Sequence, residues 1–155
     1  MKRILAFLLI VILLFSLISC KRSDNTQVTQ SKIYIGYIAL DGDTLELDEF
    51  EFITQKDEER IKELNLSESD MPGGYYIYNE SDETISFTID DKTKFTFFDV
   101  GNLFVSEDDD KKYTTTDKEQ FRKFLYGNRD IPAKTPFWVE VQGDKVISII
   151  EEFIS

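Results

Sequence analysis

The sequence predicts a β-dominated α+β fold, either a small OB-like barrel or a strongly curved antiparallel sheet, with two short helices. Three observations lead to this prediction. Short runs of aromatic and β-branched residues are separated by frequent turn signals, which is typical of strands. The apolar phase of one long strand slips by one residue near Asp48 and Glu49, which indicates a bend. Residues 137–154 alternate around Gly143-Asp144 as a terminal hairpin.

The first strand is expected at residues 33–40, which are apolar at both alternating positions, as in a strand covered on both sides. Asp41-Gly42-Asp43 indicates a hairpin turn, because Gly tolerates positive φ. In the second strand the leucines at 45 and 47 have the opposite parity to the phenylalanines at 50 and 52. A β-bulge with one extra residue would return all four side chains to one core.

The first helix is expected at residues 57–64, where acidic residues in the first turn complement the helix dipole and Ile61 and Leu64 share an inward face. The Pro- and Gly-containing loop 67–74 ends it. Further strands are expected at residues 75–78, 85–89 and 95–97, with a short one at 103–105.

The second helix opens at Thr116-Asp117-Lys118-Glu119, which fits a capping box with Thr116 as the N-cap. Phe121, Phe124 and Leu125 follow at i, i+3 and i+4, so they predict one apolar face. Gly127 is the expected stop.

The N-terminus has the pattern of a secretory signal peptide. Lys2 and Arg3 precede 15 residues, 4–18, that carry no charge and only Ser16 as a polar interruption. A permanent transmembrane helix needs about 20 apolar residues, so this run is short for one. An uncleaved anchor and a plain secreted protein remain as alternatives.

Leu17-Ile18-Ser19-Cys20 resembles the lipobox of bacterial lipoproteins. The resemblance implies cleavage between Ser19 and Cys20 and a diacylglyceryl group on the Cys20 thiol, which would place the protein outside the cytoplasm, anchored to the cell membrane. Two acyl chains give stable anchoring, at about 0.8 kcal/mol per buried CH₂. The chain then divides into a signal peptide (1–19), a lipidated cysteine with a flexible tether (20–32) and one β-rich domain (33–155).

The composition excludes several kinds of chemistry. Cys20 is the only cysteine and there is no histidine, so disulfides within the chain, His-based triads and Cys/His zinc sites are ruled out. No Walker-type or GxGxxG motif is present. The acid-rich stretches 41–43 and 106–112 lack the Gly and Glu pattern of an EF-hand calcium loop. We therefore expect no cofactor, no metal site and no catalytic residue that the sequence alone can name.

The charge makes nucleic acid an unfavourable partner. The chain carries 18 Lys and Arg against 30 Asp and Glu, a net charge of −12, and removal of residues 1–19 takes away Lys2 and Arg3 and leaves −14. Phosphates call for a basic surface instead. A well-solvated surface is the simple explanation of this acidity, and attraction of a basic partner is the functional one.

Aromatic residues suggest a binding patch. Tyr75, Tyr76 and Tyr78 follow a Pro-Gly-Gly loop, and Trp138 lies opposite in parity to its apolar neighbours. Exposed aromatics of this kind stack on sugars or peptides. Ordinary strand packing is the alternative, since Tyr is a favoured strand residue.

Three segments, DMPGGYYIYN (70–79), YTTTDKEQFRKFL (113–125) and PFWVEVQGDKVISIIEEFI (136–154), resemble an uncharacterised family of small lipoproteins from Firmicute-type bacteria. The resemblance supplies no functional residues. Two hypotheses follow. The preferred one is a non-catalytic extracytoplasmic domain that binds an envelope component or a protein partner, and the acidity of the chain favours a basic partner. The alternative is a cell-envelope hydrolase that uses a pair of carboxylates.

Overall fold

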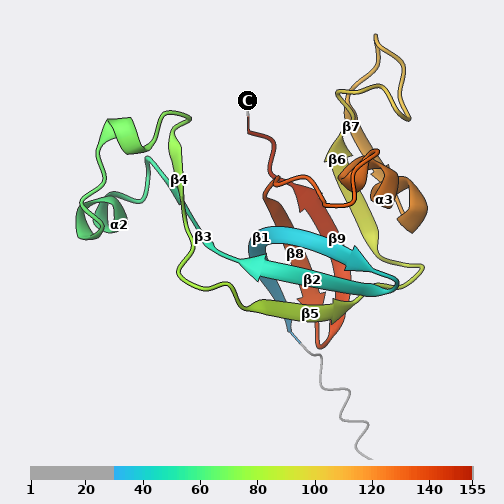
Figure 1. Ribbon diagram of the computed structural model, residues 1–155, viewed down its shortest axis with the longest axis horizontal. Coiled ribbons are helices and arrows are strands. Elements are labelled where there is room, and N and C mark those ends of the chain that lie inside the picture. The colour runs from blue at the N-terminus through green and yellow to red at the C-terminus, as the bar shows by residue number, and fades with distance from the viewer. Residues whose placement is uncertain (1–29, 155) are drawn as a thin grey trace, which may run out of the picture.

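The computed structural model describes residues 30–154. Within this range the fold is β-dominated α+β, as the sequence predicts (Figure 1). The elements in chain order are β1 (Ser31–Asp41), β2 (Thr44–Glu49), β3 (Glu51–Thr54), α2 (Glu58–Glu63), the 3₁₀ turn η1 (Glu68–Asp70), β4 (Tyr75–Tyr78), β5 (Thr84–Thr88), β6 (Lys94–Phe98), β7 (Lys112–Thr115), α3 (Lys118–Tyr126), β8 (Phe137–Gln142) and β9 (Lys145–Glu151).

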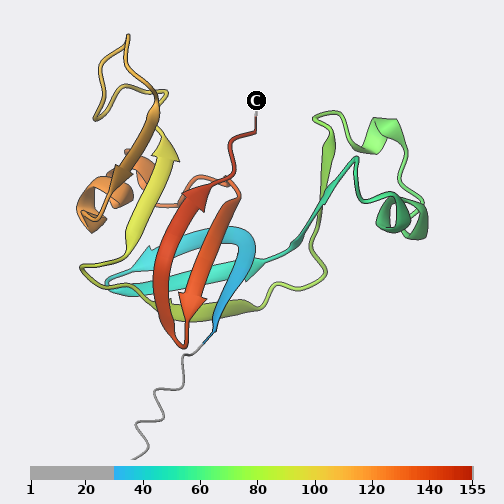
Figure 2. The same ribbon diagram turned by 180° about the vertical axis from the view of Figure 1, so that it is seen from behind.

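Five strands close into a small barrel in the order β5-β2-β1-β8-β9, and β9 returns to β5. The neighbours are antiparallel except at the closure, where β5 and β9 run parallel and Thr88 is paired with Lys145. This strongly curved, partly closed sheet confirms the prediction of a small barrel-like fold or strongly curved sheet. Beyond β9 the sheet continues through β6 and β7, and α3 lies beside them (Figures 1 and 2).

Aromatic side chains fill the core. Phe95, Phe97, Phe121 and Phe137 are fully buried, together with leucine, isoleucine and valine side chains from the barrel strands. The predicted apolar face of α3 makes this contact: Phe121 stacks on Phe95 with ring centroids 4.5 Å apart. Burial of one such side chain stabilises the fold by about 1.5–3 kcal/mol.

The N-cap of α3 differs from the prediction. The side chain of Asp117, not Thr116, accepts hydrogen bonds from the backbone N–H groups of Glu119 (2.9 Å) and Gln120 (3.2 Å). Both residues are good N-caps, and the one that takes this position is set by where β7 ends.

Both predicted hairpin turns are present. Gly42 and Gly143 have φ of 59° and 68° in the β1–β2 and β8–β9 turns, the left-handed region that favours glycine. β1 begins at Ser31, so residues 31 and 32 of the predicted tether belong to the first strand. No helix among residues 30–154 combines the length and the apolar character needed to cross a bilayer.

The predicted continuation of the second strand into one core is wrong. β2 ends at Glu49, and β3 pairs with β4 in a separate two-stranded sheet. Phe50 packs on Tyr37, with centroids 4.7 Å apart, and Phe52 stacks on Tyr75 at 5.1 Å. The parity slip therefore marks the point where the chain leaves the barrel to form a projecting arm, residues 50–83 (Figure 1).

The predicted strand at residues 103–105 is a loop. Its backbone N–H groups bond to the buried carboxylate of Asp99: Leu103 N at 2.8 Å, Phe104 N at 2.7 Å and Val105 N at 3.0 Å. These groups are therefore satisfied by one side chain and do not form a strand ladder.

Candidate functional site

The four aromatic residues predicted as a patch lie on different surfaces. In the β3–β4 register Tyr76 is paired with Ile53 and Tyr78 with Glu51, whereas Tyr75 is paired with Thr54. Because successive side chains of a strand point to opposite faces, Tyr75 lies on the other face of the arm from Tyr76 and Tyr78. The three tyrosines do not form one stacking platform.

Trp138 lies on the outside of the barrel. Its neighbours in register are Ile35 on β1 and Ile150 on β9, and its Nε1–H donates to Glu152 Oε2 at 2.6 Å. Tyr75 and Glu152 line the same hollow of about 220 Å³ between the arm and the C-terminal segment. Trp138 thus bonds to the C-terminal segment, and Tyr75 lines the hollow beside that segment.

The larger hollow is at the junction of arm and barrel. The β2–β5 ladder ends at the pair Asp48 and Thr84, and the β3–β4 ladder starts at Glu51 and Tyr78. Between these pairs the two segments of the chain, residues 48–51 and 78–84, separate. The resulting arm–barrel groove has a volume of about 630 Å³ and is lined by Ile35, Glu49, Phe50, Glu51, Phe52, Arg60, Tyr78, Asn79, Glu80, Ser81, Glu83 and Ile85.

Short polar contacts fix the two segments at the opening between them. The Asn79 side chain donates to Asp48 Oδ1 at 2.9 Å, and its own oxygen accepts from Ser81 N–H at 3.2 Å. The backbone N–H of Phe50 donates to the Ile35 carbonyl at 3.2 Å. These contacts fix the point at which the arm leaves the barrel.

The floor of the groove is apolar. Ile35 and Phe50 are buried, Phe52 is half-buried, and Ile85 is 37% exposed. Ile85 is paired with the fully buried Leu47, so it stands on the core-facing side of β5 at the mouth of the barrel. Exposed apolar surface at the bottom of a concave site favours binding of an apolar group.

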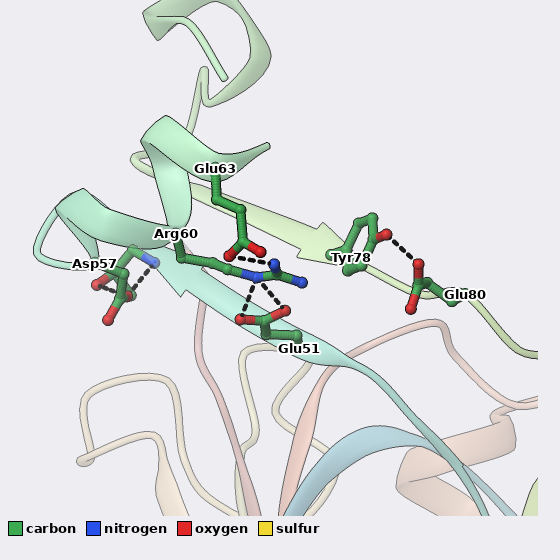
Figure 3. A network of polar contacts seen from close by, with 7 residues as sticks. Glu51, Asp57, Arg60, Glu63, Tyr78 and Glu80 are labelled. Atoms are coloured by element: carbon green, nitrogen blue, oxygen red, sulfur yellow. Dashed lines mark hydrogen bonds and ion pairs between the residues drawn. The ribbon is translucent and has the colours of Figure 1, made fainter. Parts of the chain in front are cut away.

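Arg60 of α2 forms the polar wall on the arm (Figure 3). Its Nε donates to both Glu51 oxygens at 2.9 Å and its Nη1 to Glu63 Oε2 at 2.7 Å. The guanidinium carbon lies 5.1 Å from the centroid of the Tyr78 ring, a cation–π contact. Hydrogen bonds to Glu63 and, second, to Glu51 raise the pKa of Arg60. The positive charge of Arg60 is therefore paired with these two carboxylates.

The groove carries excess negative charge. Besides Glu51, it contains Glu49, Glu80 and Glu83, and within residues 30–154 no Lys or Arg lies in ion-pair range of these three. Glu80 accepts a hydrogen bond from the Tyr78 hydroxyl, which raises the pKa of Tyr78 (Figure 3). Carboxylates that line a concave apolar surface concentrate a negative potential there.

The outer face of β2 and β5 is also acidic. Glu46 accepts hydrogen bonds from Ser86 (2.9 Å) and Thr84 (3.2 Å), and Asp48 lies beside it. Phosphates would be repelled from this surface. Among the described residues, no group of three or more acidic or cysteine side chains is arranged to hold a metal ion.

The sequence did not identify the groove. The sequence signal at the groove is the parity slip between the leucines and the phenylalanines of residues 45–52, and this slip by itself predicts a bulge within a single core. The other wall of the groove comes from residues 78–85, which are far away in the sequence. Cys20 and Ser19, the residues of the predicted lipid site, lie outside the described residues.

Comparison with models of known protein families, with curated proteins and with solved structures gave no match. The site is therefore interpreted from its own geometry and charge. The resemblance to small bacterial lipoproteins stays a prediction.

Proposed function

We propose that this protein is an extracytoplasmic lipoprotein, anchored to the membrane through Cys20, whose folded domain is a non-catalytic binding module. Its binding site is the arm–barrel groove. The observation that carries the proposal is the combination of an apolar floor with three glutamates that no Lys or Arg of residues 30–154 pairs with.

The interior of the barrel is filled by its own apolar side chains, because Leu45, Leu47, Val139 and Ile149 of the barrel strands are fully buried. A ligand therefore binds on the outside, where the arm and the barrel provide two walls. An arm that projects from a rigid barrel is suited to recognition, since binding residues are commonly held on connections between the strands of a stable scaffold.

The hydrolase alternative has less support from the geometry. A carboxylic acid catalyst needs a raised pKa in a site that also holds its partner carboxylate. Burial raises the pKa of Glu151, but this carboxylate lies outside the groove and accepts the backbone N–H of Phe98 at 2.6 Å. Its position in the β-sheet matches a structural role.

The proposal can be tested by crosslinking in intact cells. A photoreactive amino acid at position 85, in the groove, is expected to capture a specific partner. The matched control is position 131, because Ile131 is 70% exposed and does not line the groove. Equal capture from both positions, or capture from 131 alone, would refute the groove as the binding site.

A further inference from the structure

We infer that the groove receives an extended peptide segment of a partner protein that presents Lys or Arg beside a leucine-sized apolar side chain. The inference rests on the proposed function and adds the chemical class of the partner.

Two tyrosine rings of the arm each have one face covered by another side chain of the arm. One face of Tyr78 is covered by the Arg60 guanidinium, and Tyr75 is stacked on Phe52 with an interplanar angle of 18°. A sugar ring that stacked on either of these covered faces would have to displace the contact there. The arm thus favours a ligand that uses the apolar floor and the carboxylates.

Arg60, the cationic residue among those that line the groove, is already paired as well. Arg60 is shared between Glu51 and Glu63. Within residues 30–154 no Lys or Arg forms an ion pair with Glu49, Glu80 or Glu83. All three are exposed and stand around the floor formed by Ile35, Phe50 and Ile85. An anionic ligand meets repulsion here, whereas a cation finds complementary charge.

The shape of the site suits a chain in extended conformation. The groove runs along the interruption between two strand ladders, with residues 49–50 on one side and 79–83 on the other. Alternate side chains of an extended peptide point to opposite sides. One side chain can therefore contact the floor while its neighbour reaches the carboxylates at the rim.

The inference is tested by measuring the binding of two fluorescent hexapeptides to the processed, lipidated protein, residues 20–155, in neutral detergent. One alternates arginine and leucine, and the other alternates glutamate and leucine. We expect the arginine peptide alone to bind, and its binding to weaken as salt is raised from 50 to 500 mM.

The decisive variant is the triple change Glu49→Gln, Glu80→Gln and Glu83→Gln. We expect its affinity for the arginine peptide to fall about tenfold or more, because three charged contacts are removed. The matched control removes the same charge from the distant acidic loop through Glu107→Gln, Asp108→Asn and Asp109→Asn, and we expect less than a twofold change. Circular dichroism confirms that both proteins are folded.

Equal losses in the two triple variants would show a response to net charge alone and would overturn the inference. Binding of a neutral oligosaccharide such as chitohexaose, unaffected by the groove variant, would also overturn it. The proposed function fails separately: specific crosslinking from position 85 to a partner segment without Lys or Arg would leave the binding module in place and refute only the basic peptide.

Discussion

Asp99 determines the conformation of the loop that follows β6. It is 1% exposed and accepts three backbone N–H groups from residues 103–105. Burial pushes its pKa upward, but the three donors outweigh burial and hold the pKa of this carboxyl below its usual value. The charged form is therefore the one that stabilises the fold.

We predict that Asp99→Asn destabilises the protein by about 1–3 kcal/mol at neutral pH, since an amide oxygen cannot satisfy three donors as a carboxylate does. The Asp99 contribution is present above the unfolded carboxyl pKa of about 3.9 and is lost as the pH falls through the lower folded value. Urea unfolding at pH 7 and at pH 3 measures this difference. Asp109→Asn in the exposed loop is the control, and an equal effect of both changes would contradict the prediction.

Gly36 is needed where β1 passes between two neighbours. It is paired with Glu49 of β2 and Phe137 of β8. A Cβ at this position would lie 2.4 Å from the backbone oxygen of Asp48 and 2.7 Å from the Leu47 side chain. The first of these contacts is with backbone, which moves only at the cost of the strand pairing.

We predict that Gly36→Ala lowers the free energy of unfolding by about 1–3 kcal/mol through this overlap. Gly101→Ala is the matched control, because the nearest atom to its Cβ is the Leu103 Cγ at 3.9 Å. The midpoints of urea denaturation provide the measurement. A Gly36→Ala protein as stable as the control would show that the strands separate without cost.

Arg60 links the elements of the arm. It belongs to α2, a helix with no buried residue, and it contacts Glu51 on β3 and Tyr78 on β4. A six-residue helix is marginal by itself, so its stability depends on such contacts. We therefore expect the loss of Arg60 to destabilise the arm more than the barrel.

We predict that Arg60→Gln accelerates amide hydrogen exchange in α2 and at the β3–β4 pairing, while exchange in β1, β2, β8 and β9 remains unchanged. Lys62→Gln, on the same helix and exposed, serves as the control. Faster exchange throughout the barrel would mean that the arm and the barrel unfold as one unit, contrary to our expectation.

At the element level, local signals were sufficient for some features. The two-residue turns at Gly42 and Gly143 depend on positive φ and on their flanking strands, and the apolar face of α3 depends on residue spacing alone. The sequence did not indicate β7, because Lys112–Thr115 is four residues long and joins the sheet only through pairing with β6. Thr116 and Asp117 were equivalent caps until the end of β7 was known.

At the scale of the whole molecule, the lipid anchor is the prediction on which location depends. We expect Cys20→Ser to abolish incorporation of labelled palmitate and to leave the protein unprocessed or released from membranes, because no other thiol exists in the chain. Metabolic labelling and membrane fractionation measure both results. Unchanged labelling of the Cys20→Ser protein would refute the lipoprotein assignment, and Ser19→Ala, which keeps a small residue before the cysteine, should be labelled normally.

The sequence by itself determined the β-rich class of the fold, its turns, its amphipathic helix and its acidity, because these follow from residue spacing and composition. Only the tertiary structure decided that Thr88 meets Lys145 to close the ring, and that β3 leaves the barrel to pair with β4. Both depend on partners distant in sequence. The groove is a consequence of that departure: Phe50 and Phe52, which parity predicts in the barrel core, instead line the groove, beside glutamates that no Lys or Arg of residues 30–154 pairs with.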